Sequence, residues 1–365
     1  MKIVQLVTQM EAGGAQRVAM LLNQAFKERG YDPEVWFLYL KRPTYQGIPG
    51  VRVLLEHKPV GIDYLKIAFE FQKLLQSHQP DILITHTYYA NIMGQSIARL
   101  GGIAQRLAVQ HNPVDTYPKI ANLVDRLLGT TGFYTANIAV STVVVDSVVN
   151  YPLGYKQHLQ KIYNGIPSLA SQHLAGVGKA STNENRVRER WNLPQHVPLL
   201  INVGRLALQK NQAILIAALT DLPEAHLLFI GEGELRSSLQ TKVAALKLEE
   251  RVHFLGEMKS EDVLDLLGIS DVFVFPSLYE AMPMALVEAM GMGLPIVAAD
   301  IPAMREVLGD AGLLVPAESA KEIAVAVRQI LDSPELASHL RQSSLHRSTQ
   351  FSIEKMVTSY ERLFK

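Results

Sequence analysis

The stretch YEAMPMALVEAMGMGLPIVAAD, residues 279–300, has the features of a helix start that binds an anion. Pro283 suits the first helical turn, because its missing N–H costs nothing there. The N–H groups that follow it have no carbonyl one turn behind them, so they are free to bind a phosphate. The predicted donors are Met284, Ala285 and Leu286.

Two glutamates flank this helix start. Glu288 lies four residues after Met284, hence on the same helix face and one turn deeper. Its carboxylate can accept hydrogen bonds from a ribose diol, whereas Glu280, before the helix, can reach hydroxyls of a group attached beyond the phosphates. A structural interpretation stays open, in which one acid favours the helix dipole and the other pairs with a nearby base.

A short cationic loop lies in GRLALQKNQ, residues 204–212. Arg205 can form two parallel hydrogen bonds to a phosphate, and Lys210 can add a compact positive charge. The pair predicts a clamp for a diphosphate. The spacing is also compatible with two solvated surface side chains.

The glycine pair Gly13-Gly14 follows the first apolar run and precedes a helix expected to begin near Ala15. Glycine lets the backbone approach a ligand closely, although a tight turn uses the same pair. The pattern is not GxGxxG, so the dinucleotide fingerprint is absent from the place where a dehydrogenase needs it.

His111 follows an apolar run and precedes Pro113, so we expect it in a loop at a ligand-binding edge. An imidazole there could donate a hydrogen bond to a sugar hydroxyl or respond to developing charge. His86 has the same kind of placement, directly after DILIT.

The elements that must position these residues follow a regular rhythm. Short apolar runs alternate with longer amphipathic stretches, which predicts βα units and parallel sheets covered on both faces. The rhythm stops after YNGIP, in a polar segment, and restarts at PLLINVG. We therefore predict an α/β protein with two doubly wound domains, residues 1–167 and 168–350. Apolar residues spaced through 351–365 predict a terminal helix that docks on a domain.

Ligands in such folds bind beyond the carboxyl ends of the strands. Polar and glycine residues directly after the apolar runs are therefore the candidates for binding. In the second half they include Gly204 after LLINV and Gly231 after HLLFI, in addition to the cationic loop.

Composition excludes several classes of protein. The 365 residues contain no cysteine, which excludes disulfides, thiolate zinc sites and cysteine nucleophiles. There is no D-x-D triplet, no H-E-x-x-H and no cluster with metal-ligand spacing, so we expect no metal and no other cofactor. The start, MKIVQLVTQM, resembles a strand more than a signal peptide, and no segment has the apolar length of a membrane span.

Charge is distributed unevenly although the formal net charge is zero. Residues 1–170 have 16 basic and 11 acidic side chains, and residues 171–365 have 19 and 24. This asymmetry is compatible with chance, or with a first half that faces an anionic membrane or acceptor. No lysine or arginine run is dense enough to indicate nucleic acid.

Taken in order, these motifs resemble glycosyltransferase family 4, the retaining group with the GT-B architecture of two facing Rossmann-like domains. The resemblance covers nearly the whole chain. It rests on GGAQRV (13–18), YNGIP (163–167), VGRLALQKNQ (203–212), IGEGEL (230–235), VHFLG (252–256) and an E-x7-E pattern formed by Glu280 and Glu288.

The resemblance implies a nucleotide-diphospho-sugar donor held mainly by the second domain. Arg205 and Lys210 would neutralise the diphosphate. Glu288 would bind the ribose, and Glu280 would contact the transferred sugar. His111 matches the family position that contacts the sugar from the first domain.

Two further details follow from the resemblance. Gly14 would leave room near the phosphates, and the terminal helix would cross back onto the first domain. The family often has E-G-F-G where this chain has Glu280-Ala281-Met282-Pro283. Fewer free N–H groups and the bulkier Ala281 narrow the expected sugar pocket, so they bear on which sugar is transferred.

The function implied is retaining transfer of a hexose or N-acetylhexosamine from a nucleotide sugar, of which UDP-sugar is the commonest choice in the family. The expected acceptor is a saccharide, first a lipid-linked one and second a soluble glycan, in cell-surface glycan biosynthesis. The expected location is the cytoplasm, at the inner face of the membrane. Two alternatives are a nucleotide-sugar epimerase of the same fold and a non-catalytic module that binds nucleotide sugars.

Overall fold

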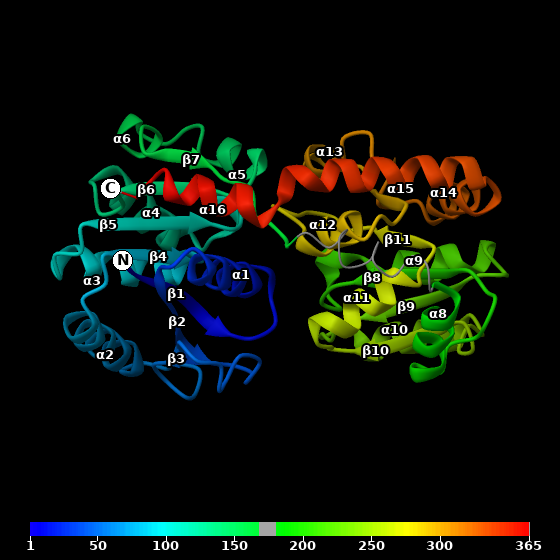
Figure 1. The fold of residues 1–365 in the computed structure, drawn as a ribbon, viewed down its shortest axis with the longest axis horizontal. Coiled ribbons are helices and arrows are strands. Elements are labelled where there is room, and N and C mark those ends of the chain that lie inside the picture. The colour runs from blue at the N-terminus through cyan, green and yellow to red at the C-terminus, as the bar shows by residue number, and fades with distance from the viewer. Residues whose placement is uncertain (168–179, 365) are drawn as a thin grey trace. The chain divides into compact units, whose positions relative to one another are not determined.

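The computed structural model describes residues 1–167 and 180–364, which form two compact units (Figure 1). One unit consists of Met1–Pro167 and the segment from Ser352 onward, and the other ends at Phe351. Each unit has its own parallel sheet with helices packed on it, so the predicted fold class is confirmed. The residues directly after the predicted boundary at 167 lie outside the described part of the chain.

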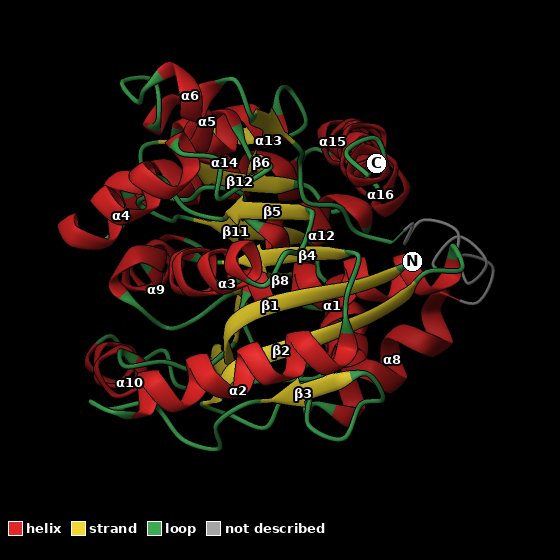
Figure 2. Ribbon diagram, turned by 90° about the vertical axis from the view of Figure 1, so that its left-hand side faces the viewer, coloured by secondary structure: helices red, strands yellow, loops and turns green. Residues whose placement is uncertain are grey.

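The N-terminal sheet has seven strands in the order β3-β2-β1-β4-β5-β6-β7, all paired in parallel. The strands are β1 Lys2–Met10, β2 Asp32–Leu40, β3 Val51–Val53, β4 Ile82–His86, β5 Gln105–Gln110, β6 Ala136–Ala139 and β7 Leu159–Lys161. The helices of this unit are α1 Gly14–Glu28, α2 Asp63–His78, α3 Tyr88–Leu100, α4 Lys119–Thr130, α5 Thr142–Ser147, α6 Leu153–Lys156 and α16 Ile353–Glu361. Figure 2 shows β2, β1, β4 and β5 side by side in this order.

Alternation along the strands buries both faces of this sheet. Leu6 of β1 belongs to a core with Trp36 and with residues of α2 and α3. The next residue, Val7, belongs to a second core with Phe37 and with Ala19 of α1. Near-continuous apolar runs such as KIVQLV are therefore read correctly as strands covered on both sides.

The predicted terminal helix is α16, and it packs on α1 within the N-terminal unit. The ring of Phe26 lies 6.3 Å from that of Tyr360 and 5.5 Å from that of Phe364. Arg29 pairs with Glu361, and Ile166 forms a bridge to Ser352. The apolar residues of the tail thus dock on the first domain, as the resemblance implies.

The C-terminal sheet has six parallel strands in the order β10-β9-β8-β11-β12-β13. The strands are β8 Leu199–Val203, β9 His226–Ile230, β10 Val252–Gly256, β11 Val272–Phe275, β12 Ile296–Ala299 and β13 Leu313–Val315. The helices are α8 Ala180–Arg190, α9 Gln212–Ala218, α10 Arg236–Ala245, α11 Ser260–Gly268, α12 Met284–Gly291, α13 Pro302–Leu308, α14 Ala320–Asp332 and α15 Pro334–Ser348.

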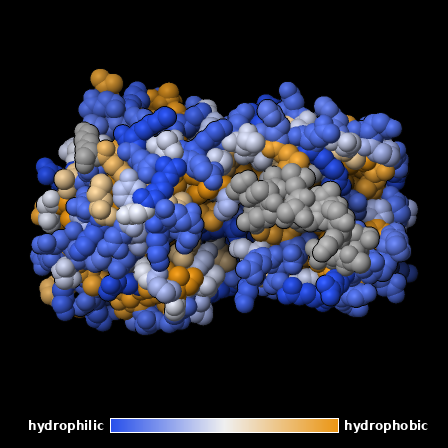
Figure 3. Space-filling model, viewed as in Figure 1, coloured by the Kyte–Doolittle hydropathy of each residue, from blue (hydrophilic) through white to orange (hydrophobic). Residues whose placement is uncertain are grey.

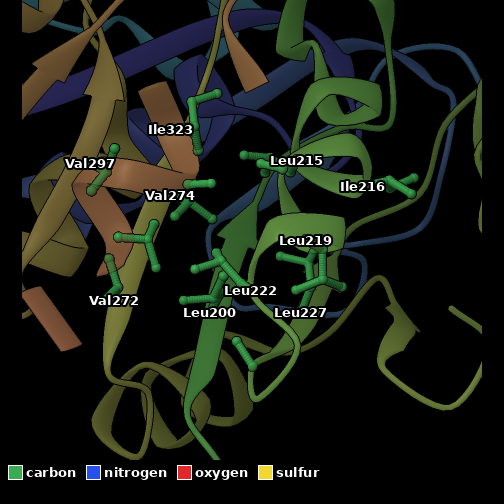
Figure 4. Packing of buried hydrophobic residues seen from close by; sticks show 14 of the residues in the cluster. Leu200, Leu215, Ile216, Leu219, Leu222, Leu227, Val272, Val274, Val297 and Ile323 are labelled. Carbon is green, nitrogen blue, oxygen red and sulfur yellow. The ribbon is translucent and has the colours of Figure 1, made fainter. Parts of the chain in front are cut away.

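The core of the C-terminal unit joins its central strands to α9 and α14 (Figure 4). Leu200 and Val274 of the sheet pack with Leu215 of α9 and Ile323 of α14. Each fully buried side chain of this kind stabilises the fold by about 1.5–3 kcal/mol relative to exposure. The core holds the ends of β8, β9 and β11 in place, and these ends carry the predicted binding loops.

Two observations concern the segments outside the sheets. Part of the polar segment between the domains, Ala180–Arg190, forms the helix α8. No helix within residues 1–167 and 180–364 combines the length and apolar character needed to cross a bilayer.

Candidate active site

Lys210 and Glu280 come together at the carboxyl edge of the C-terminal sheet. Lys210 ends the short 3-10 turn Leu208–Lys210, which follows β8, and its ammonium group pairs with the carboxylate of Glu280, which follows β11. The side chains are only 18% and 8% exposed. The Lys210 nitrogen also lies 4.9 Å from the centre of the Phe275 ring, a favourable cation–π position.

Amide side chains on either side of Lys210 brace this loop. Gln209 Nε2 donates to the Tyr279 carbonyl at 2.8 Å, and the Gln209 carbonyl accepts from the Leu278 N–H at 2.8 Å. Asn211 has a left-handed backbone, with φ at 53°, and its Nδ2 donates to the Ala317 carbonyl at 2.8 Å. Our sequence reasoning missed these bracing residues, although the run Q-K-N-Q around the lysine was a usable signal.

Arg205 is exposed, in the same loop as Lys210. Its guanidinium makes no ion pair within the described part of the chain, whereas its carbonyl accepts a hydrogen bond of 2.9 Å from Gln212 Nε2. The backbone at Arg205 is therefore held while its cationic side chain remains accessible. The loop thus combines an accessible cation with a second one that a carboxylate already holds.

Gly204 and Gly231 bring two loops into direct backbone contact. Gly204 N–H donates to the Ile230 carbonyl at 2.9 Å. Gly231 has a φ of 130°, and a Cβ at this position would lie 2.2 Å from the Gly204 carbonyl oxygen. Such a contact is impossible for a side chain, so only glycine allows the loops after β8 and β9 to approach this closely.

The start of α12 differs in two respects from the sequence prediction. Pro283 is the N-cap residue of the helix and not part of its first turn. The N–H of Leu286 is not free, because it donates to the Pro283 carbonyl at 3.1 Å. The anion site predicted here is therefore reduced to Met284 and Ala285, whose N–H groups precede the first hydrogen bonds of the helix.

Glu288 is 5% exposed and lies on the buried helix α12. Its carboxylate therefore lies within the domain and not on a solvated face, and its role toward a ribose stays a prediction. Ser277, between β11 and Glu280, is fully buried, and its hydroxyl has no hydrogen-bond partner among the described residues. Nothing in the sequence predicted that Ser277 is buried near Glu280, since a lone serine after a strand gives no distinctive signal.

Gly14 begins α1 directly after the N-cap residue Gly13, one residue earlier than predicted. Gly13 is extended, and a Cβ there would lie 2.5 Å from Oε1 of Gln16. Gln16 in turn donates to the Gln9 carbonyl at 3.1 Å. Gly13 therefore packs closely against the Gln16 side chain, and the role of Gly14 near phosphates stays a prediction.

His111 and His86 are brought together at the carboxyl edge of the N-terminal sheet. His111 Nε2 lies 2.9 Å from His86 Nδ1, and His86 Nε2 lies 3.1 Å from Gln5 Oε1. Gln110, which precedes His111, is buried and donates to the carboxylate of Asp125 at 3.0 Å, so it has a structural role.

Burial sets the charge of the two histidines. It lowers the pKa of His111 to about 4. The pKa of His86, which is fully buried, is held well below its usual range by burial first and by the nearby His111 second. Both imidazoles are therefore neutral at physiological pH.

This shift predicts a pH dependence of stability. The unfolded chain binds a proton at His86 below its ordinary pKa of about 6.5 and the folded chain does not, so the contribution is complete above pH 6.5 and is lost as the pH falls. The loss is at most about 1.4 kcal/mol per pH unit for one group. Urea unfolding at pH 7 and pH 5 should therefore show the wild-type chain losing more stability than His86→Asn. An equal loss for the two proteins would contradict the assignment.

The predicted residues thus lie in two groups. The residues predicted to bind the donor lie in the C-terminal unit, and His111 and Gly14 lie in the N-terminal unit. Among the described residues, no group of three or more histidine, aspartate or glutamate side chains could hold a metal ion. In the C-terminal group, the cations and the helix N–H groups can bind an anion, and the carboxylates can accept hydrogen bonds from hydroxyls. This combination suits a phosphorylated sugar.

Two family models match the chain. The one described as "Glycosyltransferase Family 4" matches residues 12–168, and the one described as "Glycosyl transferases group 1" matches residues 183–347. The matched ranges include every candidate site residue in both units.

Curated relatives and a solved structure agree with these matches. An uncharacterized glycosyltransferase of Methanocaldococcus jannaschii is 27% identical over 247 residues, which is 65% of this chain and 59%, less than two thirds, of the relative. The lipopolysaccharide core biosynthesis glycosyltransferase LpsE of Rhizobium meliloti is 25% identical, covering 96% of this chain and 95% of LpsE. The crystal structure of Anabaena HepE with UDP and glucose has a TM-score of 0.84 at 19% identity, over 99% of this chain and 98% of HepE. The likeness to HepE supports the GT-B fold.

Proposed function

The chain belongs to glycosyltransferase family 4, and from this we propose that it transfers a sugar from a nucleotide-diphospho-sugar to a saccharide acceptor in glycan biosynthesis. The observation that carries the proposal is the loop after β8, in which Arg205 is accessible and Lys210 contacts Glu280. This contact places Lys210, which can bind a phosphate, directly beside Glu280, whose carboxylate can bind a sugar hydroxyl.

Arg205 and Lys210 neutralise the diphosphate, together with the N–H groups of Met284 and Ala285. Glu280 releases part of its contact with Lys210 when the donor binds, and its carboxylate then accepts from hydroxyls of the transferred sugar. Glu288 accepts from the ribose diol. The support for Glu288 is its place on the same helix as the two N–H donors.

The reaction retains the configuration of the sugar and needs no metal. The bond between the anomeric carbon and the phosphate oxygen breaks, and the acceptor oxygen forms its bond on the same face. The leaving phosphate oxygen takes the proton of the acceptor hydroxyl, so no protein nucleophile is required. The two cations stabilise the charge that grows on the diphosphate, which is the term expected to dominate the rate.

The donor is a UDP-sugar carrying a hexose or an N-acetylhexosamine. Support for UDP comes from HepE, which was crystallised with UDP and glucose. Ala281 and Met282 are both buried beside Glu280. Their side chains occupy volume where the family often has glycine and phenylalanine, so they select the sugar by shape.

The acceptor is a saccharide, first a lipid-linked one. Tyr88 and Tyr89 open α3 at the carboxyl edge of the N-terminal sheet, with ring centres 4.3 Å apart, and Tyr117 lies 4.7 Å from Tyr88. Tyr89 is 45% exposed. Aromatic rings with polar tips offer both apolar area and hydrogen bonds to a sugar.

The protein associates peripherally with the cytoplasmic face of the membrane through α2 and the loop before it. This membrane-facing patch exposes apolar side chains among charged ones of both signs, as on interfacial helices (Figure 3). Its exposed members are Lys58, Val60, Ile62, Leu65, Lys66, Phe69 and Lys73. Lys66 pairs with Asp63, and Glu56 and Glu70 are exposed nearby. Attraction to an anionic surface therefore comes from the excess of basic residues in residues 1–170 as a whole, each contributing about 1 kcal/mol near the surface.

Vesicle sedimentation tests this part of the proposal. The wild-type chain should sediment with vesicles that contain phosphatidylglycerol, less so at high salt, and the double substitution Leu65→Ser with Phe69→Ser should reduce the bound fraction severalfold. Leu100→Ser is the matched control, because Leu100 is 84% exposed at the end of α3, outside the patch. Absence of salt-sensitive binding by the wild-type chain removes the membrane association.

A donor and acceptor screen tests the activity itself. The protein is incubated with each nucleotide sugar alone and then with lipid and glycan extracts, and the products are identified by mass spectrometry. We expect release of nucleoside diphosphate with a glycosylated product only when acceptor is present. A changed nucleotide sugar without acceptor identifies an epimerase, and no product with either mixture identifies a binding module.

A further inference from the structure

A chain of hydrogen bonds runs from Gln5 of β1 through His86 of β4 to His111, which follows β5. The two contacts measure 3.1 Å between Gln5 Oε1 and His86 Nε2, and 2.9 Å between His86 Nδ1 and His111 Nε2. Gln5 and His86 are fully buried. Because each contact needs one donor and one acceptor, the chain decides where the protons of both imidazoles lie.

The direction of the chain is set at Gln5. Gln5 Nε2 donates to the Ala19 carbonyl at 3.0 Å. A carbonyl only accepts, so the amide nitrogen must face Ala19 and the amide oxygen must face His86. The Gln5 oxygen also only accepts, and His86 Nε2 therefore carries a hydrogen.

The remaining steps follow because both imidazoles are neutral. A neutral imidazole has one N–H, so His86 Nδ1 is bare and accepts a hydrogen bond. His111 Nε2 must then donate, which leaves His111 Nδ1 bare. Nδ1 of His111 has no hydrogen-bond partner among the described residues, and the His111 side chain is only half-buried.

The backbone beside His86 is held in an unusual conformation. Thr87 has a φ of 76°, which a β-branched residue rarely adopts. Its hydroxyl lies 2.5 Å from the hydroxyl of Thr8, which also accepts from the Ala90 N–H at 3.3 Å. Strain of this kind persists only where surrounding contacts define the position, and it concentrates at functional sites.

We propose that Gln5 and His86 are positioning residues that hold His111 as its Nε2–H tautomer, so that Nδ1 accepts a hydrogen bond from a hydroxyl of a bound saccharide. This inference rests on the proposed function for the identity of the ligand. The tautomer of His111 is independent of that function, because hydrogen bonds within the unliganded chain determine it.

The inference changes the role expected for His111. The sequence prediction allowed an imidazole that donates to a sugar hydroxyl or responds to developing charge. Because His86 Nδ1 is bare in this arrangement, the single ring proton of His111 is donated to His86 across the 2.9 Å contact. His111 therefore orients a saccharide hydroxyl by accepting its hydrogen bond at Nδ1. The imidazole is neutral, so it does not stabilise the charge of the phosphates.

NMR of the full chain labelled with 15N at histidine tests the tautomer directly. Long-range correlations between ring protons and ring nitrogens distinguish a protonated from a bare nitrogen. We expect a protonated Nε2 and a bare Nδ1 for His111 at neutral pH, with signals assigned by comparison with His111→Asn. A protonated Nδ1 of His111 in the wild-type chain overturns the inference, whatever the activity.

Two substitutions of His86 form a matched pair. Both remove the imidazole and both introduce an amide. His86→Asn places its amide oxygen close to the position of Nδ1 and can still accept from His111, whereas the longer His86→Gln reaches toward Gln5 and leaves His111 without a fixed acceptor. We expect H86N to keep the Nε2–H tautomer of His111 and H86Q to give a mixture.

Transfer kinetics complete the test. Residues that orient metal-binding imidazoles typically affect activity by about 10- to 100-fold, and by analogy kcat/KM for transfer should fall about tenfold further in H86Q than in H86N. Equal losses in two variants of equal thermal stability overturn the positioning role. A wild-type chain that transfers no sugar overturns the proposed function and the saccharide as ligand, and the NMR result still decides the tautomer.

Discussion

Replacing Lys210 with alanine lowers the rate of sugar transfer by about a hundredfold or more, because removal of one group that stabilises transition-state charge typically costs 10²- to 10³-fold. The same direction is expected for Arg205→Ala. The loss should appear mainly in kcat, since charge on the leaving diphosphate grows as the bond to the sugar breaks. Initial rates at varied donor concentration separate the effects on kcat and KM.

Lys210→Ala also removes the partner of Glu280, whose side chain is only 8% exposed, so a loss of stability must be separated from a loss of catalysis. Urea unfolding of the variant is therefore measured beside the kinetics, and Lys210→Met, which keeps the apolar stem beside Phe275, is compared. Lys321→Ala removes an exposed lysine of α14 in the same unit and should leave transfer unchanged. Parent rates in both Lys210→Ala and Arg205→Ala mean that the clamp assignment is wrong.

Gly231→Ala destabilises the chain by about 3 kcal/mol, which combines backbone strain with a steric clash. The residue has a φ of 130°, and the added Cβ would lie 2.2 Å from the Gly204 carbonyl oxygen. The loops after β8 and β9 must then separate, and the loop with Arg205 and Lys210 moves with them. Urea unfolding measures the loss, and binding of UDP by calorimetry shows its effect on the site.

Gly204→Ala is the matched comparison, because it adds the same methyl group to the other side of this contact. Its Cβ would lie 3.5–3.8 Å from the carbons of the Lys210 side chain, which is ordinary van der Waals contact. We expect stability within about 1 kcal/mol of the wild-type chain and UDP binding close to that of the wild-type chain, because the contacts with Lys210 stay ordinary. Equal stability of the two variants would show that close approach of the loops is not needed.

The sequence predicted the elements well, because burial on both faces of a parallel sheet requires long apolar runs. KIVQLV, DILITH and DVFVFPS are strands in the structure, and the tail is the docked helix α16. The loops between them were less predictable. The N–H of Leu286 was expected to be free and is used by Pro283, since hydrogen bonds in the first turn depend on local backbone angles that residue types do not specify.

Contacts between distant loops were also beyond the sequence. Nothing in the order of residues states that Glu280 pairs with Lys210, 70 positions earlier, or that His86 contacts His111. These pairs form because parallel strands place their carboxyl ends at one edge, and strand order decides which loops are neighbours. β4 is adjacent to β5, and β8 to β11, so their loops meet.

The sequence by itself therefore determined the class of fold, the family and the types of chemical group available, because periodicity and local motifs depend on neighbours along the chain. Only the tertiary structure decided which of those groups act together. It showed that Lys210 is held by Glu280 while Arg205 remains accessible, and that Glu288 is buried. It also provides the basis for the proton position proposed for His111, because hydrogen-bond direction depends on Ala19, Gln5 and His86, which meet only in the folded domain.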